Sequence, residues 1–125
     1  MRITSVETVF ADGNHNAFTD LVQFRGEYYL AFRSCPDGHM IYSSSQIVIL
    51  ASADGVRWRE RARFRVPGGD LRDPHFLATP DRLFVYSGCW PVTEGAPHHK
   101  RQAEMHSYVM YTEDGTTWSG PHVAA

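Results

Sequence analysis

Hydrophobic residues lie along this chain in short runs separated by polar turn residues, and they show no lasting helical periodicity. No stretch of twelve residues keeps apolar positions at i, i+3, i+4 and i+7 without an interrupting Gly or Pro. β-Branched and aromatic residues gather instead in short runs bounded by turn residues, a pattern typical of strands. These runs cover residues 17–24, 27–33, 46–52, 57–66, 74–78, 82–87 and 107–112, and another begins after Trp118. The pattern predicts an all-β protein.

The strand pattern occurs twice along the chain. Residues 26–32 match residues 81–87 at an offset of 55, and residues 50–58 match residues 110–118 at an offset of 60. A four-stranded unit that repeats about every 50 residues is typical of β-propeller blades. The repeat therefore predicts two four-stranded antiparallel blades.

The blade boundaries follow from the same repeat. We expect a single propeller segment over residues 1–125, with one blade at 16–66 and a second at 67–125. Residues 3–10 precede the first blade much as 59–66 precede the second, so residues 1–15 are expected to form an outer strand and a loop. The last strand of the second blade, by contrast, has barely begun at 121–125.

Two blades leave open edges, which invite pairing with further strands. One explanation is assembly, in which the first strand of one copy supplies the last strand of another and three copies close a ring. The other explanation is that the chain is the remainder of a longer propeller.

Composition narrows the class of protein. Of the 125 residues, 42% are hydrophobic and 21% are charged, enough apolar surface for a folded core. The net charge of −2 argues against nucleic acid as a partner. No window reaches the ~18 apolar residues of a membrane span, and residues 1–7 hold no apolar signal-peptide core. With only Cys35 and Cys89 as cysteines, we expect a reduced, cytoplasmic protein with no membrane partner.

Each repeat carries one stretch of the form Ser/Thr-x-Asp-Gly-x-x-Trp, at residues 52–58 and 112–118. Asp-Gly is a strong turn signal, because Gly adopts positive φ freely. The two stretches resemble the Asp-box of the sialidase superfamily, whose members are β-propeller glycosidases, and the resemblance covers about a third of a six-bladed ring. In that family Asp-boxes join the third and fourth strands of a blade, away from the ligand. The resemblance implies structural roles for Asp54, Gly55, Trp58, Asp114, Gly115 and Trp118.

The same topology implies that ligands bind at the opposite end of the blades. The segments expected there hold six of the seven histidines and both cysteines. Such crowding of polar groups at one end of a sheet protein is typical of a binding site. The candidate substrate-binding residues are His15, Arg33, Asp37, His39, Arg72, His75 and Trp90.

Arg72-Asp73-Pro74 resembles the Arg-Asp-Pro motif of the five-bladed fructan-processing and arabinanase-like glycosidases, in which the Asp grips sugar hydroxyls. Asp20 lies near the corresponding place of the first blade. Most glycoside hydrolysis needs two carboxyl groups, so Asp20 and Asp73 are the candidate catalytic residues. Only two arginines, Arg33 and Arg72, are expected at this end, and a sialic acid carboxylate needs more.

Three interpretations of function stay open. The chain is a glycosidase-like enzyme acting on carbohydrate, a non-catalytic lectin that uses the same loops, or a structural propeller piece. No cofactor is expected. No metal site is expected either, because adjacent histidines such as His98 and His99 seldom share one ion.

Overall fold

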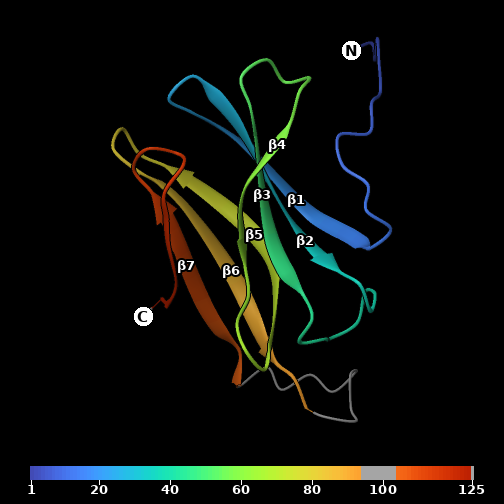
Figure 1. The fold of residues 1–125 in the computed structure, drawn as a ribbon, viewed down its shortest axis with the longest axis vertical. Coiled ribbons are helices and arrows are strands. Elements are labelled where there is room, and N and C mark those ends of the chain that lie inside the picture. The colour runs from blue at the N-terminus through green and yellow to red at the C-terminus, as the bar shows by residue number, and fades with distance from the viewer. Residues whose placement is uncertain (94–103, 125) are drawn as a thin grey trace.

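The computed structural model describes residues 1–93 and 104–124, which form two four-stranded antiparallel sheets (Figure 1). The strands of the first sheet, in spatial order, are β1 (His15–Phe24), β2 (Glu27–Cys35), β3 (Gln46–Ser52) and β4 (Arg59–Phe64). Those of the second sheet are β5 (Gly69–Ala78), β6 (Leu83–Pro91), β7 (His106–Thr112) and β8 (Trp118–Val123). The prediction of an all-β fold with two four-stranded blades is confirmed.

The register of the two sheets follows the repeat in the sequence. Tyr28 pairs with Ser52 in the first blade, and Leu83 pairs with Thr112 in the second. These partners differ by the same offsets of 55 and 60 that align the sequence. We call two residues repeat-equivalent when they are related by 55 positions in the first two strands of a blade, or by 60 in the last two.

The core lies between the two blades, where one face of the first sheet packs on one face of the second. The first blade contributes alternate residues such as Tyr29, Ala31 and Ile49, and the second contributes residues such as Leu83 and Met110, all at most 1% exposed. Full burial of one large apolar side chain stabilises a fold by roughly 1.5–3 kcal/mol. This face-to-face packing is therefore the main source of stability.

Polar contacts join the blades at both of their edges. At the edge formed by β1 and β5, the amide of Phe76 donates a hydrogen bond of 2.7 Å to Oδ2 of Asp20. At the other edge, Arg61 of β4 pairs with Glu27 at 2.8 Å and donates to the carbonyl oxygen of Gly115 at 3.2 Å. These contacts fix how the two sheets lie against each other.

The outer strand predicted at residues 3–10 is wrong for the chain by itself, because residues 1–12 form no regular structure. The expectation of a missing last strand is also wrong. Trp118–Val123 forms β8 and pairs with β7, so the edge that residues 3–10 would have joined is already occupied within the chain. The N-terminal segment contacts the first blade instead, where the Phe10 and Phe32 rings lie 4.9 Å apart.

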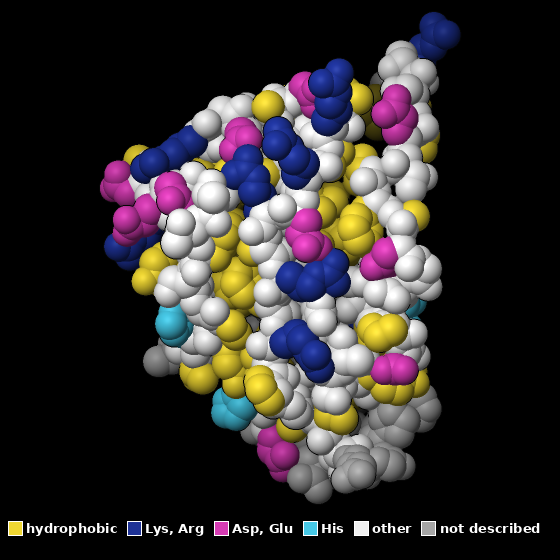
Figure 2. Space-filling view, viewed as in Figure 1, with side chains coloured by type: hydrophobic (Ala, Val, Ile, Leu, Met, Phe, Trp, Pro, Cys, Tyr) yellow, Lys and Arg dark blue, Asp and Glu magenta, His cyan; other side chains and the backbone are white. Residues whose placement is uncertain are grey.

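Basic side chains run over β4 on the face shown in Figure 2. Arg63 of β4 pairs with Glu60, and Arg65, just after the strand, donates to the carbonyl oxygen of Ser43. Charged residues on an edge strand discourage further strand pairing. In the part of the chain that the structure describes, no helix is long and apolar enough to cross a membrane.

Candidate functional site

The two ends of the blades carry different chemistry. The turns that connect β3 to β4 and β7 to β8 lie at the upper end in Figure 1, and the loop from β2 to β3 lies at the lower end. The Asp-Gly turns therefore lie opposite to most of the candidate ligand-binding residues.

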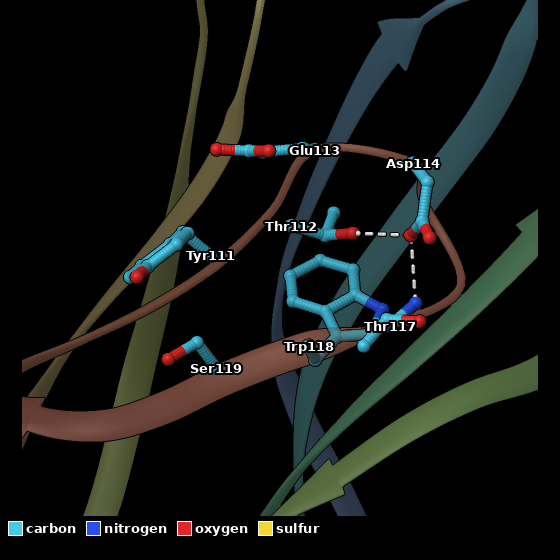
Figure 3. Close-up of a pocket in the computed structure, with 7 residues that line it drawn as sticks. All are labelled: Tyr111, Thr112, Glu113, Asp114, Thr117, Trp118 and Ser119. Carbon is cyan, nitrogen blue, oxygen red and sulfur yellow. Dashed lines mark hydrogen bonds between the residues drawn. The ribbon is translucent and has the colours of Figure 1, made fainter.

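In both Asp-Gly turns the aspartate serves the turn itself. Asp114 Oδ1 accepts the amide of Thr117 at 2.7 Å (Figure 3). It also accepts the amide of Thr116 at 2.8 Å, and the Thr112 hydroxyl accepts the amide of Gly115. The amides of Thr117 and Thr116 lower the pKa of Asp114 to about 2. Because the carboxylate oxygen is occupied by backbone donors, the turn needs no ligand to explain this aspartate.

The first blade repeats this arrangement. Asp54 Oδ1 accepts the amides of Val56 and Arg57 at 2.9 and 2.8 Å, and these bonds lower the pKa of Asp54 to about 2, with that of Arg57 the stronger. Nε1 of Trp58 donates to the carbonyl oxygen of Gly55.

A hollow of about 390 Å³ lies beside the second turn, between Tyr111, Trp118 and Ser119 (Figure 3). A hollow of about 190 Å³ lies beside the repeat-equivalent turn of the first blade, lined by Asp54 and Arg57. Because a hollow lies beside the same turn in both blades, it is a repeated feature of the fold and does not by itself indicate a functional site.

The most buried polar group at the lower end is a charge cluster centred on Asp70. The carboxylate is fully buried and accepts hydrogen bonds of 2.9 Å from Nε and Nη2 of Arg33 and 3.0 Å from Nη2 of Arg72. The amide of Tyr42 adds a fourth at 2.9 Å. The cluster ties the loop between β2 and β3 to the start of β5.

This cluster corrects the expectation that Arg33 and Arg72 clamp a substrate. Arg33 is fully buried, and its other donors bind the carbonyl oxygens of Gly38 and Met40. Arg72 is 8% exposed and donates to the carbonyl oxygens of His39 and Met40. The guanidinium groups are held by Asp70 and the loop, so in the chain by itself neither is free to receive a sugar carboxylate.

Each blade has one irregularity at the same place in its first strand. The register shifts between Ala17 and Asp20 in β1, and between Arg72 and His75 in β5. Phe18 has φ of 59° in the first irregularity, and Asp73 has φ of 51° in the second. Phe18 and Asp73 are repeat-equivalent, so the fold builds the same bulge twice with different side chains. Positive φ is strained for a residue other than glycine, and such strain gathers at functional sites.

The bulge in β5 exposes Asp73. Within the described residues its side chain makes no hydrogen bond or ion pair, so both oxygens are open to a ligand. His75, two positions further on, has a side chain that is 76% exposed and lies 4.0 Å from the Asp20 carboxylate.

Asp20 differs from Asp73 in its surroundings. Its two oxygens accept the amides of Leu21 and Phe76, and its side chain is 34% exposed. Its repeat-equivalent residue is His75, so Asp20 lies two positions from Phe18, the residue that corresponds to Asp73. The structure brings Asp20 to His75 and uses it to join the blades.

Aromatic rings lie next to this surface. His39 lies edge-on to His15 at 5.1 Å and near Phe18 at 5.6 Å, and the Arg72 guanidinium lies 5.8 Å from the Phe18 ring. Nδ1 of His15 is buried and has no hydrogen-bond partner among the described residues. The rings connect the start of β1 with the loop after β2.

Two further candidates lie in the loop after β2 and on β6. Asp37 is exposed in the loop after β2, where it accepts the Ser44 hydroxyl. Trp90 is half-buried near the end of β6 and pairs in register with Asp70. His98 and His99 lie outside the described residues, among which no cluster of metal-ligating side chains occurs.

The two cysteines have no features of a nucleophile. Cys35 is fully buried. Burial, with the nearby charge of Asp70, raises the pKa of the Cys89 thiol to about 11. A thiol with a raised pKa carries little reactive thiolate near neutral pH.

Two residues of this region, Asp70 and Phe18, were not among the candidates predicted from the sequence. Asp70 could have been found, since Arg33 and Arg72 together need a carboxylate and Asp70 is two positions from Arg72. The positive φ of Phe18 could not be predicted from the sequence. Gly, Asn or Asp, and not an aromatic residue, are the residues that indicate positive φ.

Comparison with solved structures finds similar folds at low sequence identity. A sialidase from Trypanosoma rangeli, solved in complex with sialic acid, has a TM-score of 0.66 and 11% identity over 87% of this chain and 20% of its own. An exo-inulinase from Aspergillus awamori has a TM-score of 0.60 and 14% identity over 88% of this chain and 26% of its own. The chain thus spans only about a quarter or less of these proteins.

No protein-family model and no curated protein matches the sequence. The likeness is one of fold, and it agrees with the two sheets described above. The chain has the fold of two β-propeller blades, and both of these structural neighbours are β-propeller glycosidases.

Proposed function

We propose that this chain binds a neutral carbohydrate on the surface around Asp73. The observation that carries the proposal is the exposed carboxylate of Asp73, which has no partner among the described residues and is held at φ of 51° in a bulge of β5. A side chain held in a strained backbone conformation without a structural partner is a candidate for contact with a ligand.

The neighbouring side chains suit a sugar. A carboxylate accepts two hydrogen bonds side by side, which matches adjacent hydroxyl groups of a sugar ring. His75 offers an exposed imidazole that donates or accepts, and the His39 and Phe18 rings offer apolar faces for the C–H side of a sugar. The glycosidase neighbours share this fold, which supports carbohydrate as the ligand class.

Charge favours a neutral sugar over an acidic one. Both arginines of this region donate to Asp70 and to loop carbonyls, so neither offers a free guanidinium. The exposed charged groups are the carboxylates of Asp73 and Asp20, which would repel an anionic sugar.

Hydrolysis is the second candidate function, favoured by the carboxylates of Asp20 on β1 and Asp73 on the neighbouring β5. A glycosidase needs one of its two carboxyl groups as a proton donor. Asp20 accepts two backbone amides and Asp73 is open to water, so neither sits in an apolar enclosure that would keep it protonated. Binding is therefore the function that the geometry supports best.

The test is a titration of the full chain, followed by amide NMR shifts, with a neutral fructo-oligosaccharide and, separately, with sialyllactose. We expect saturable shifts with the neutral sugar and weaker ones with sialyllactose. Asp73→Asn should weaken binding by ~10-fold or more, because a hydrogen bond to a charged group contributes ~1.5–3 kcal/mol. No saturable shift with either sugar overturns the proposal.

Asp81→Asn is the matched control, since Asp81 is an exposed aspartate in the turn between β5 and β6. It should bind like the unchanged chain. Chromatography of the sugar after incubation checks the second candidate: new reducing ends that vanish in Asp73→Asn would favour hydrolysis over binding alone.

A further inference from the structure

We propose that copies of this chain pack head to tail, with the first blade of one copy covering the free face of the second blade of the next. The proposal concerns assembly and does not depend on which ligand the chain binds. It rests on the contact between the chain's own two blades, which serves as a template.

In the template, the first blade turns one face toward the second. Tyr29, Ala31, Ile49 and Ala51 lie on this face and are at most 3% exposed. They are covered by the back of the second blade, which carries Leu83, Val85 and Met110.

The second blade has the same kind of face, but no blade covers it. The repeat-equivalent residues are Phe84, Tyr86, Val109 and Tyr111, which with Leu77 define the free face of the second blade. Leu77 is 50% and Tyr86 is 39% exposed, whereas Ala31, repeat-equivalent to Tyr86, is fully buried. Phe84 lies 6.3 Å from Tyr86 and 5.9 Å from Tyr111, so the aromatic rings form one continuous patch.

The first blade has a matching back, which no other blade covers. Leu21, Tyr28, Leu30, Phe32 and Leu50 define this free face of the first blade, and Phe32 and Leu50 are only 2% exposed because Phe10 and Trp58 pack against their cluster. Leu21 is 59% and Tyr28 is 37% exposed, whereas Leu83, repeat-equivalent to Tyr28, is fully buried. Phe10 covers only part of this face, next to a hollow of about 160 Å³.

The surroundings of Gly115 and Gly55, one in each Asp-Gly turn, independently support the same contact. A Cβ added to Gly115 would lie 2.0 Å from Oη of Tyr29, so the second turn sits directly on a residue of the first blade. At the repeat-equivalent Gly55, an added Cβ would meet only the Tyr28 side chain, at 3.8 Å. The space over Gly55 is open, and Phe84, repeat-equivalent to Tyr29, is the side chain that would fill it from another copy.

A second copy is the occupant because one chain carries both halves of the contact. The two free faces differ from each other, and each corresponds to one side of the template. Large uncovered apolar faces mark interaction surfaces. A contact between two different faces adds copies in one direction and closes when the rotation allows. Three copies supply six blades, the number in the sialidase-type ring that the sequence resembles.

Assembly would also complete the candidate site. Asp73 and His75 lie on β5, the first strand of the second blade. Within one chain, β5 lies next to β1, the first strand of the other blade, on one side only. In a head-to-tail assembly, β1 of the next copy lies on the other side of β5. Each ligand surface around Asp73 would then be shared by two copies.

The experiment measures solution mass by light scattering after size exclusion, at about 100 µM of the full chain. We expect about 43 kDa, three times the chain mass of 14.2 kDa. Tyr86→Lys blocks the free face of the second blade, and Leu21→Lys blocks that of the first, so each variant alone should be a monomer. Circular dichroism of each variant checks that its sheets are intact.

Mixing the two variants gives the sharpest result. The unchanged second blade of Leu21→Lys can still receive the unchanged first blade of Tyr86→Lys, so an equimolar mixture should form a dimer of about 28 kDa. Val123→Lys is the control, since Val123 is 63% exposed on neither free face, and it should leave the mass of the assembly unchanged.

Several outcomes overturn the proposal. A monomeric unchanged chain means that no second copy covers these faces. An assembly that survives both lysine variants uses another surface. A Leu21→Lys protein that remains a dimer while Tyr86→Lys is a monomer indicates contact between two identical faces. None of these results depends on sugar binding.

Discussion

Asp70 joins β2, β5 and the loop between β2 and β3 through its side chain. It accepts hydrogen bonds from Arg33 of β2, Arg72 of β5 and the amide of Tyr42, and it is fully buried. Two buried guanidinium groups near one carboxylate leave an excess positive charge, which the loop carbonyls at 38–40 partly offset. The loop after β2 is therefore held by charge as well as by packing.

Replacement of Asp70 by Asn should be strongly destabilising. The neutral amide leaves the fully buried Arg33 without its counter-charge, and breaking a buried pair in this way costs ~3–5 kcal/mol. Urea unfolding followed by circular dichroism measures the loss. Asp81→Asn, exposed and at the other end, should change the free energy of unfolding by less than ~0.5 kcal/mol. An Asp70→Asn protein as stable as that control would contradict this account of the cluster.

At the scale of elements, the sequence predicts strands well where the hydrophobic pattern and the partner strands agree. The runs in β2 and β3 are continuously hydrophobic, and both strands are central in their sheet and mostly buried, so pattern and pairing give the same answer. Residues 3–10 and 118–123 fail for opposite reasons. The first segment has a strand pattern, but β8 already occupies the edge of β7 that it was expected to join. The second contains Gly120 and Pro121, which suggest a turn, yet it pairs with β7. Local propensity yields to the partner that is available.

The sequence could place the candidate residues at one end of the blades, but it could not give the surroundings of several of them. Strand topology decides which loops share an end, so the order of the strands is enough for that placement. The roles of Arg33 and Arg72 could not be read in the same way. Whether a guanidinium faces solvent or a buried carboxylate depends on how the loop after β2 folds over β5, which no local pattern encodes.

The two Asp-Gly turns should make the free energy of unfolding depend on pH in the acid range, through the carboxylates of Asp54 and Asp114. The pKa of Asp54 and Asp114 is about 2 in the fold, below the ordinary value of 3.8. Their contribution is therefore present above pH ~4 and is lost as the pH falls from about 4 to about 2. The double variant Asp54→Asn, Asp114→Asn should be less stable at pH 6 and should lose less stability between pH 4 and pH 2 than the unchanged chain.

Thermal unfolding at a series of pH values, scanned for both proteins, measures this difference. Asp81→Asn serves again as the control and should keep the full acid dependence. Parallel stability curves for the double variant and the unchanged chain would mean that the turn aspartates do not contribute to the acid limb.

At the scale of the whole molecule, the exposed apolar residues are distributed in a way that a closed, self-sufficient domain would not need. Four of the large exposed side chains (Leu21, Tyr28, Leu77 and Tyr86) lie in two pairs on the two free faces. Their repeat-equivalent residues are packed in the core between the blades. The stability of the chain should therefore include a contribution from contacts between copies.

Protein concentration should then change the melting temperature. Binding between folded copies stabilises the folded state by mass action, so the transition should move to higher temperature from about 2 to about 200 µM. Tyr86→Lys should melt at the same temperature at both concentrations. A transition of the unchanged chain that does not move with concentration would contradict this expectation.

The bulge that holds Phe18 in one blade and Asp73 in the other has a consequence for how binding chemistry can change. Its backbone path is the same with an aromatic ring or with a carboxylate, although Asp tolerates positive φ better than Phe does. Each blade thus offers a preformed slot whose side chain varies independently of the sheet around it. Under the proposed function, a substitution at position 18 or 73 would change the ligand contact of one blade while the backbone of the bulge stays in place.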